Sequence, residues 1–539
     1  MTTTLKRWTT FIVAVLLLNL SLTFENKWPT PMIRWQGEAS IELAIVVLAL
    51  ALLWRALGRL PRAAVNTVGA IWLALAIGRY ADVTAPALYG RDINLYWDIR
   101  YVSDVGAMLT TAASFWMIGL VVAGAALALT ILFLLVRWAI ARVARALDRA
   151  DERRVLIWTA AVLAVLFVAQ TAAPGLPAVP EFATPVTGTY ARQARLVMNA
   201  RAAAAGAQVL APSPAINSDL SRVKGADVFL IFIESYGAIT YERPEINARL
   251  TKSRAALAAA IHDTGRDVVS TFVESPTFGG SSWLAHISLL SGIEVRDPDT
   301  DALLMTQQRD TLAKLFARRG YRTIAWMPGL KHPWPEGSFY GFNEIYGAQR
   351  VDYHGPAFGW FAVPDQFSLA RIDQDEVNQP QRPPLFVFFP TLSTHTPFSP
   401  APPYQPDWSR VLTDHAYDQA DVDRAFDQEI DWLNLGPMYA DAVEYAYTVL
   451  AGYLRLHEDR DFVMILLGDH QPPALVSGQG APWDVPVHVI ASQSPGREQV
   501  LDRLRAHGFR TGLTPARPTT SPMHALLPVL LDALGDPQP

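Results

Sequence analysis

Five long apolar runs in the first third of the chain constrain its fold more than any other feature. They cover roughly residues 8–24, 41–57, 64–80, 108–136 and 155–173. A helix needs about 20 mostly apolar residues to cross the bilayer core, so these runs predict a transmembrane domain of five helices. Lys6 and Arg7 precede the first run, as in a signal peptide. No small-residue cleavage site follows, so we favour an uncleaved anchor.

Basic residues indicate the orientation of these helices. They accumulate before the first run, between the second and third, and between the fourth and fifth. They are Lys6, Arg7, Arg55, Arg59, Arg62, Arg137, Arg142, Arg145, Arg149, Arg153 and Arg154. Such segments stay in the cytoplasm. Five crossings then place everything after about residue 173 outside, which predicts a multi-pass protein of the cell (inner) membrane with a periplasmic or otherwise extracytoplasmic domain.

Composition excludes several kinds of chemistry. The net charge of −5 gives no reason to expect a nucleic-acid partner. The chain has no cysteine, so disulfides, thiolate metal sites and cysteine nucleophiles are excluded. Residues 174–222 begin with a proline-rich stretch and continue with a helical pattern around 190–208. We interpret them as a juxtamembrane linker with a surface-lying helix, or as a plain spacer, between a transmembrane domain at 1–173 and a catalytic domain at 223–539.

The soluble part alternates short apolar runs with helical patterns. Val228–Ile233 is continuously apolar, as in a strand buried on both faces of a parallel sheet. Similar runs are Thr323–Trp326, Leu385–Phe389, Phe462–Leu467 and Val485–Ile490. Helical patterns lie between them, for example at Thr311–Arg319 and Met438–Leu456. This alternation predicts an α/β domain with a mostly parallel central sheet.

Polar clusters follow three of these runs, where ligands bind in such sheets. They are Glu234-Ser235, Thr394-His395 and Gly468-Asp469-His470; a fourth, Gly279-Gly280-Ser281-Ser282, precedes a helical segment. Each cluster alone is more often a cap, a turn or a surface feature. Together they offer oxygen ligands, imidazoles and a hydroxyl at the start of a helix, which favours anions. The combination suits a divalent metal that activates a hydroxyl nucleophile.

The order of these motifs resembles the alkaline-phosphatase and sulfatase superfamily, and within it the membrane-anchored lipoteichoic acid synthases and the phosphoglycerol and phosphoethanolamine transferases. In sulfatases the nucleophile begins a segment that ends in S-L-L-[ST]-G. The segment from Ser282 to Gly292 matches that end and puts Ser282, rather than Ser281, in the nucleophile position. The sulfatase proline and arginine are replaced by Leu284 and His286. Conversion to formylglycine is therefore not expected, and an unmodified serine fits a phosphotransferase.

The resemblance also implies roles for single residues. Glu234, Ser282, Asp469 and His470 would bind the metal, as Mn²⁺, Mg²⁺ or Zn²⁺, and His395 would face the transferred group. Trp334 lies near a substrate-binding tryptophan of the family. The arginine that binds phosphate in lipoteichoic acid synthases is replaced by Glu336, so Lys331 or His332 could supply the charge instead. Glu336 could face an ammonium group or simply be a solvated loop residue.

The leading hypothesis is a metal-dependent transferase that moves a phosphoalcohol head group from a membrane phospholipid to an envelope glycan or lipid. The head group would be phosphoglycerol or phosphoethanolamine, carried on a phospho-serine intermediate at Ser282. One alternative is a phosphodiesterase or sulfatase-type hydrolase with water as the acceptor. Another is a silent membrane scaffold or sensor that retains the fold, which the four competent residues at the presumed metal site disfavour.

Overall fold

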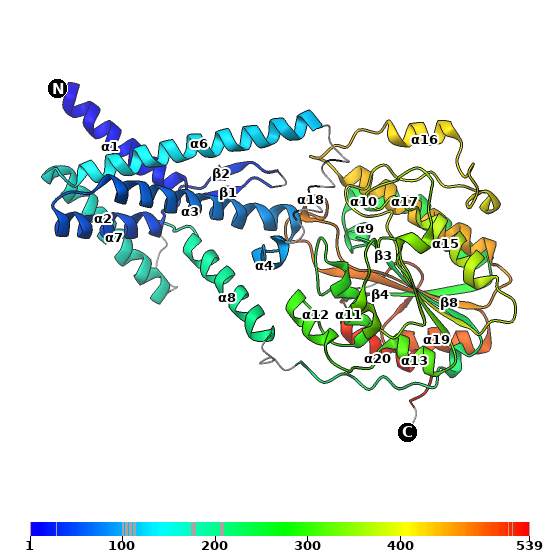
Figure 1. The fold of residues 1–539 in the computed structure, drawn as a ribbon. Helices are drawn as coiled ribbons and strands as arrows, with labels where there is room; N and C mark the ends of the chain where they lie inside the picture. The colour runs from blue at the N-terminus through cyan, green and yellow to red at the C-terminus, as the bar shows by residue number, and fades with distance from the viewer. Residues whose placement is uncertain are drawn as a thin grey trace. The chain divides into compact units, whose positions relative to one another are not determined.

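The computed structural model describes residues 2–28, 30–99, 115–173, 179–204, 210–515, 517–519 and 521–537, together with positions 102, 106 and 110. Contacts divide the chain into two compact units, Met1–Arg201 and Ala202–Pro539 (Figure 1). The division falls inside the predicted linker. The finer domain boundaries at 173 and 223 remain predictions.

Helices dominate the first unit. Its described elements are α1 (Thr2–Leu20), α2 (Ile41–Leu57), α3 (Arg62–Tyr89), α4 (Leu95–Asp98), α6 (Phe115–Ala146), α7 (Ala150–Ala172), α8 (Val186–Ala204), and a hairpin of β1 (Phe24–Asn26) and β2 (Ile33–Trp35). In the described part of the chain, α3, α6 and α7 are long and apolar enough to cross a membrane. The first two predicted runs are helical, as α1 and α2, but their crossing remains a prediction. Part of the run at 108–136 lies outside the described residues.

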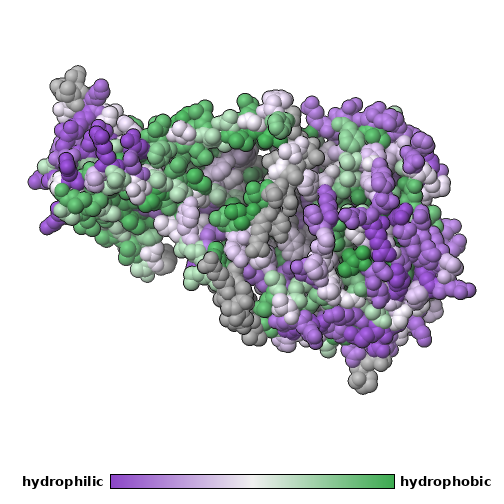
Figure 2. All heavy atoms as spheres, viewed as in Figure 1, coloured by the Kyte–Doolittle hydropathy of each residue, from purple (hydrophilic) through white to green (hydrophobic). Residues whose placement is uncertain are grey.

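The surface of the first unit is apolar over much of its length. Leu120, Val121 and Val122 on α6 are each more than 60 % exposed, at 66 %, 65 % and 63 %. Figure 2 shows hydrophobic residues covering the sides of these helices, with hydrophilic residues gathered near the N-terminus. Such a continuous apolar surface is costly in water and stable against lipid. It therefore supports the membrane role of this unit.

Basic side chains from two helices meet on one buried carboxylate of a third helix. Glu152 of α7 has no exposed surface, and it accepts two hydrogen bonds from Arg142 of α6 at 2.8 and 3.0 Å. Arg7 of α1 lies 3.0 Å from the same carboxylate. Because breaking a buried ion pair leaves an uncompensated charge, this cluster ties the start of α1 and α7 to the end of α6. It explains part of the arginine enrichment structurally. The orientation across the membrane remains a prediction.

The segment that leaves the membrane helices is anchored to them. The helix expected around 190–208 is present as α8. At its first residue the Val186 amide donates to Glu42 Oε1 at 2.6 Å, and Glu42 is 4 % exposed. The guanidinium of Arg79 donates to the carbonyl oxygens of Phe24 and Thr184, at 2.9 and 3.4 Å. The beginning of the linker is therefore fixed to the first unit rather than free.

The second unit contains a mixed, mostly parallel sheet. Its strands are β3 (Asp227–Ile233), β4 (Arg266–Glu274), β5 (Arg322–Trp326), β6 (Glu344–Tyr346), β7 (Leu385–Pro390), β8 (Phe462–Gly468), β9 (Asp484–Ser492), β10 (Arg510–Thr511) and β11 (Ser521–Pro522). The order is β10-β4-β9-β8-β3-β7-β5-β6, with β11 beside β4. The five from β8 to β6 are mutually parallel, whereas β9 is antiparallel to both β8 and β4. All five predicted strands are confirmed, within one or two residues at their ends.

Helices cover both faces of this sheet (Figure 1). On β3, Phe229, Ile231 and Ile233 belong to one buried cluster, while the alternating Val228, Leu230 and Phe232 belong to the other. Helices α10 (Pro244–Asp263), α15 (Asp365–Ile372) and α17 (Gly436–Leu456) contribute to the first cluster, and α11 (Ser282–Ser291), α13 (Leu312–Arg318), α19 (Pro495–Ala506) and α20 (Leu526–Leu534) to the second. Burial on both faces explains why the run was apolar without alternation.

The remaining short helices lie in the connections. They are α9 (Ile239–Glu242), α12 (Pro298–Met305), α14 (Ala348–Val351), α16 (Gln419–Phe426) and α18 (Ala474–Ser477). More important for the site is the strand register. Ile233 of β3 pairs with Gly468 of β8, and Phe232 pairs with Pro390 of β7. The carboxyl ends of three parallel strands are therefore level, and the residues that follow them lie at one edge of the sheet.

Candidate active site

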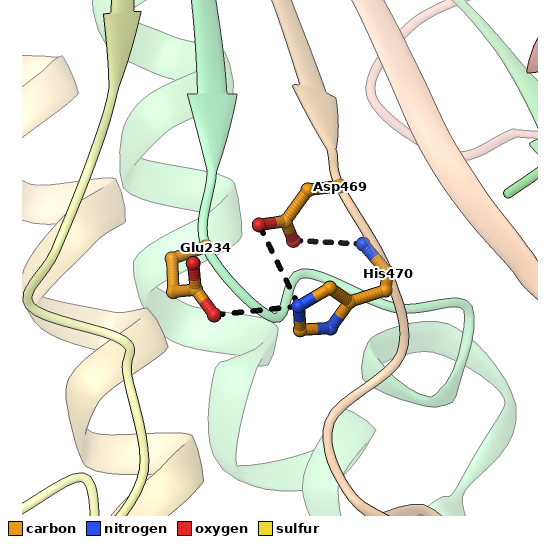
Figure 3. Close-up of side chains that lie close together, drawn as sticks. All are labelled: Glu234, Asp469 and His470. Atoms are coloured by element: carbon orange, nitrogen blue, oxygen red, sulfur yellow. Dashed lines mark hydrogen bonds and ion pairs between the residues drawn. The ribbon is translucent and has the colours of Figure 1, made fainter. Parts of the chain in front are cut away.

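Three side chains at this edge form the group that could hold a metal ion (Figure 3). Glu234 follows β3, and Asp469 and His470 follow β8. One ligand atom from each lies within 4.8 Å of the others. His470 Nε2 is 3.5 Å from Glu234 Oε1 and 3.7 Å from Asp469 Oδ2. The three residues are only 7 %, 1 % and 1 % exposed, so bulk water does little to screen them.

Backbone groups hold these ligands in place. Asp469 Oδ1 accepts hydrogen bonds from the amides of Ser235 at 2.8 Å and His470 at 2.7 Å, which leaves Oδ2 for a cation. The Glu234 amide donates to Thr391 Oγ1 at 3.1 Å. A Cβ atom at Gly468 would lie 1.9 Å from the Tyr236 carbonyl oxygen. Only glycine therefore permits the close approach of the two strand ends that brings Glu234 and Asp469 together.

The proton on His470 can be assigned from its neighbours. Its Nδ1 lies 2.8 Å from the Gln471 carbonyl oxygen. A carbonyl oxygen only accepts, so Nδ1 carries hydrogen, which leaves Nε2 as the ring nitrogen that can coordinate a cation beside the two carboxylates. Burial, and next the Glu234 carboxylate, raises the pKa of Asp469 to about 6. A buried set of two carboxylates and an imidazole lone pair is the donor set of a divalent cation. The residues present therefore fit such an ion.

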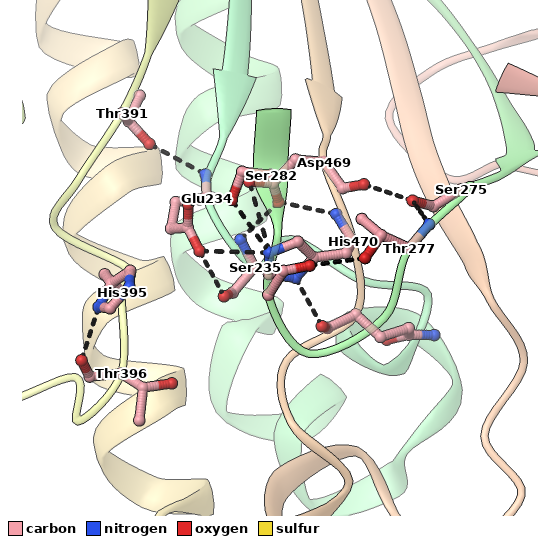
Figure 4. A network of polar contacts seen from close by, with 12 residues as sticks. Glu234, Ser235, Ser275, Thr277, Ser282, Thr391, His395, Thr396, Asp469 and His470 are labelled. Carbon is pink, nitrogen blue, oxygen red and sulfur yellow. Dashed lines mark hydrogen bonds and ion pairs between the residues drawn. The ribbon is translucent and has the colours of Figure 1, made fainter. Parts of the chain in front are cut away.

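The hydroxyl of Ser282 faces the same cluster (Figure 4). Ser282 Oγ is 3.0 Å from Glu234 Oε2 and 3.2 Å from His470 Nε2. Ser282 is the first residue of α11, and Ser281 before it is left-handed, with φ 63°. Gly279 and Gly280 also have positive φ, at 67° and 144°. This tight turn presents Ser282 at the positive end of a helix, where negative charge is favoured.

His395 lies beside this cluster rather than in it. It follows β7, and Figure 4 shows it apart from Glu234, with Nδ1 donating to the Thr396 carbonyl oxygen at 2.7 Å. Nε2 is therefore the nitrogen that can accept a proton. Low-polarity surroundings lower the pKa of His395 to about 4, although the ring is partly exposed. Asp365 braces this loop, because it accepts from the amides of Leu392 at 2.7 Å and Ser393 at 3.3 Å.

The predicted substrate-binding residues follow β5, and the structure separates them. Trp334 is half-buried and packs against Tyr340 with ring centroids 5.3 Å apart. The exposed Lys331 places Nζ 5.3 Å from the Trp360 ring centroid and 5.9 Å from that of Phe361. Glu336 is exposed, and its carboxylate raises the pKa of Asp301 after burial and Asp297. Among these predicted residues, Lys331 is the one that the described contacts link to His395. Both Lys331 and His395 contact the ring of Phe361.

Several residues that build the site were not predicted from the sequence. Thr391 lies two positions after the predicted strand Leu385–Phe389. The end of that apolar run is the sequence signal that could have identified it. Ser275 donates to the Asp469 carbonyl oxygen at 2.5 Å, but it follows β4, which was not predicted. Phe361 packs edge-on against His395, with ring centroids 4.9 Å apart. Nothing in the sequence around Phe361 signals that contact.

Comparisons with known proteins agree with this architecture. Residues 297–513 match the Sulfatase family model, a range that contains His395, Asp469 and His470. A comparison with curated proteins gave no match.

Several solved structures are similar to the chain. One is the lipooligosaccharide phosphoethanolamine transferase EptA from Neisseria meningitidis, which is 13 % identical to this chain. The match covers 92 % of this chain and 89 % of the EptA chain, with a TM-score of 0.49. The lipoteichoic acid synthase LtaP from Listeria monocytogenes is 13 % identical over 63 % of this chain and 78 % of its own, with a TM-score of 0.35. The phosphoglycerol transferase GacH from Streptococcus pyogenes is 12 % identical, and the match covers 60 % of this chain and 88 % of the GacH chain, also with a TM-score of 0.35.

At such low identity, the likeness carries no information about the substrate of this chain. The family model matches residues 297–513 of the second unit. The second unit therefore contains a sulfatase-type domain.

Proposed function

We propose that this protein is a membrane-anchored, metal-dependent transferase that moves a phosphoalcohol head group from a phospholipid to an envelope glycan or lipid. One observation carries the proposal. The Ser282 hydroxyl, unmodified and at a helix N-terminus, is in contact with both Glu234 and the lone-pair nitrogen of His470. A serine so placed can act as a nucleophile toward phosphorus.

Glu234, Asp469 and His470, together with Ser282 itself, would hold the metal as Mn²⁺, Mg²⁺ or Zn²⁺. When bound, the metal would lower the pKa of the serine hydroxyl and neutralise charge on the phosphoryl oxygens. Two carboxylates and one imidazole suit any of these three ions. Asp469 would keep its second oxygen on the backbone amides, so that the ligand cannot rotate away.

In the first half-reaction Ser282 Oγ forms a bond to the head-group phosphorus while the bond from phosphorus to the glycerol oxygen of the lipid breaks. The serine proton passes to a neighbouring acceptor, and the departing oxygen takes up a proton as diacylglycerol leaves. His395 is partly exposed, so water that reaches the site beside it can supply that proton. The products are diacylglycerol and a phosphodiester between Ser282 and the head-group alcohol.

In the second half-reaction an acceptor hydroxyl attacks the same phosphorus and Ser282 leaves. His395 is suited to remove the proton of that hydroxyl. Its Nδ1 is committed to the Thr396 carbonyl oxygen, and its pKa of about 4 keeps Nε2 unprotonated at neutral pH. A glycan or lipid hydroxyl gives transfer, whereas water would give hydrolysis.

A membrane anchor suits a lipid donor, because it confines the enzyme to the surface that holds its substrate. We propose five crossings with both the N-terminus and the arginine-rich loops in the cytoplasm. The sulfatase-type domain would then face the periplasm or its equivalent outside the inner membrane. The three apolar helices and the apolar surface of the first unit support its location in the membrane, and the arginine-rich loops support the proposed orientation.

Mass spectrometry of lipids and of intact protein tests the proposal. Purified full-length protein with added Mn²⁺ is incubated with phosphatidylglycerol or phosphatidylethanolamine. We expect diacylglycerol release and a head-group phosphate adduct on Ser282, and the mass of the adduct identifies the donor. A folded, metal-loaded sample that yields neither product contradicts the transferase and favours a hydrolase acting on another ester.

The variant Ser282→Ala should lower turnover by roughly six orders of magnitude, the size seen when a nucleophilic serine is removed. It should retain metal, measured by elemental analysis. Ser281→Gly is the matched control, because it removes the neighbouring hydroxyl at a position whose φ of 63° suits glycine. Near-normal turnover by Ser282→Ala would reject Ser282 as the nucleophile.

A further inference from the structure

Lys331 lies in an unusual setting for a surface lysine. Its ammonium group faces the rings of both Trp360 and Phe361, at 5.3 and 5.9 Å from their centroids. Within the described part of the chain, no carboxylate forms an ion pair with it. A cation above an aromatic face is attracted by the ring quadrupole, yet its N–H groups remain free to donate elsewhere. Lys331 is thus held in position with an unused positive charge.

The same aromatic pair contacts the reaction site. Phe361 packs edge-on against His395, with ring centroids 4.9 Å apart. A Cβ atom at Gly329 would lie 3.1 Å from Phe361 and 3.3 Å from Leu392, so the loops after β5 and β7 pack closely around this ring. Because β5 and β7 are parallel neighbours, Lys331 and His395 lie at the same edge of the sheet as Glu234. One ring separates Lys331 from His395.

We propose that Lys331 is an anion-binding residue that receives a phosphate oxygen of the substrate, and that Trp360 and Phe361 are the residues that position it. This inference rests on the proposed function and deepens it. A phosphoryl group that reaches Ser282 carries negative charge on its outer oxygens, and the described side chains around His395 offer Lys331 as a cation for them. The same charge would equally suit a phosphate on the acceptor.

The positioning roles can be separated from a structural role by a double-mutant cycle. Lys331→Met removes the charge and keeps the length of the side chain, and Lys331→Arg keeps the charge. Trp360→Leu removes the aromatic face, and Trp360→Phe keeps one. The matched control is Lys252→Met, which removes another exposed lysine, on α10 in the same unit. Thermal unfolding of each variant establishes that it is folded.

Inorganic phosphate is the first probe, added to the Mn²⁺-loaded full-length protein and followed by calorimetry. Lys331→Met should weaken phosphate binding roughly 10-fold to 100-fold, as expected for loss of a hydrogen bond to a charged group. Lys331→Arg should restore most of it, and Lys252→Met should bind like the wild type. Trp360→Leu should weaken binding about 2-fold to 5-fold, the strength of an exposed cation–π contact, and Trp360→Phe should recover it.

The decisive result is the effect of Trp360→Leu on phosphate affinity with and without Lys331. In the Lys331→Met background Trp360→Leu should cause no further loss, because the ring acts through the lysine. An equal loss in both backgrounds, or unchanged phosphate affinity in Lys331→Met, overturns the inference. The second probe is turnover of phosphatidylglycerol and phosphatidylethanolamine, where the KM for each donor should follow the same pattern. Failure of both lipids to react rejects the transferase but not the anion site, which the phosphate titration decides independently.

Discussion

Two parts of the active site differ in how they are built. The candidate metal-ligand cluster of Glu234, Asp469 and His470 directly follows two neighbouring strands and is almost fully buried. The proposed anion-binding group of Lys331, Trp360 and Phe361 lies on longer loops and remains partly exposed. Backbone amides hold the first part, at 2.7 and 2.8 Å from Asp469. Ring contacts of about 5 to 6 Å hold the second.

This contrast separates chemistry from selectivity. Ligands attached to the sheet cannot move without breaking the strand register, so the same reaction can be retained across a superfamily. Loop residues held by dispersion and cation–π contacts can be exchanged at small cost in stability. The following predictions test the contrast, beginning with the buried cluster.

The largest effect should come from Asp469→Asn. Asparagine can keep the Oδ1 contacts to Ser235 and His470 but removes the charge that faces a cation. Affinity for Mn²⁺ should fall by about 100-fold or more, since even residues behind metal ligands contribute 10-fold to 100-fold. The metal-free variant should unfold at a higher temperature than the wild type, because a buried carboxylate next to Glu234 is removed.

Calorimetry and thermal unfolding with and without metal measure both effects. Asp365→Asn is the matched control, because Asp365 is also a buried carboxylate that accepts backbone hydrogen bonds, and its pKa is likewise raised to about 6 by burial. It should leave Mn²⁺ affinity unchanged. Equal losses of Mn²⁺ affinity in the two variants would contradict the assignment of Asp469, and not Asp365, as a metal ligand.

His395→Gln should have an intermediate effect, on turnover rather than on metal binding. We expect kcat to fall about 100-fold to 1000-fold, within the range for loss of a general base. In the wild type, lowering the pH protonates His395 only near its pKa of about 4. At saturating Mn²⁺, which keeps Asp469 ionised, activity should therefore rise with pH through about 4 and be level above about 5, where Nε2 is free.

The pH profile of kcat with a lipid donor tests this prediction, and the limb near pH 4 should disappear in His395→Gln. A limb near the ordinary histidine value of about 6.5 would contradict the low-polarity environment assigned to His395. Unchanged kcat in the variant would reject its role as a base. Metal content should be the same in both proteins, because His395 makes no described contact with the cluster.

The smallest effect should come from Glu336→Gln. The side chain is exposed and forms no ion pair within the described residues, so stability should change by less than about 0.5 kcal/mol. Turnover of either donor should change less than about 2-fold, as for a surface residue away from the chemistry. Kinetics with phosphatidylethanolamine and phosphatidylglycerol measure this. A selective loss with phosphatidylethanolamine would instead assign Glu336 to the ammonium of that head group.

Much of the sheet was predictable, and the exceptions have physical causes. β3 and β8 are buried on both faces, so their sequences are uninterrupted apolar runs. β4 carries Arg266, Asp267, Ser270 and Thr271, which masked its pattern, although the last two are 0 % and 1 % exposed. Ser270 is satisfied there by His488 Nδ1 at 2.7 Å and the Gly512 carbonyl oxygen at 2.6 Å. Polar strand residues with buried partners cannot be recognised from one sequence.

The sequence alone determined the two-part organisation, the positions of five buried strands along the chain, and the candidate residues Glu234, Ser282, Asp469 and His470. It could do so because burial and catalysis both restrict residue type at positions next to a strand, and those positions are local in the chain. The tertiary structure decided which residues far apart in the chain are in contact. It joined Ser282 to strand ends 48 and 188 residues away, assigned the His470 tautomer through Gln471, and placed Phe361 between Lys331 and His395. Loop residues meet because the parallel strands bring their carboxyl ends to one edge, and no local pattern encodes which side chains then touch.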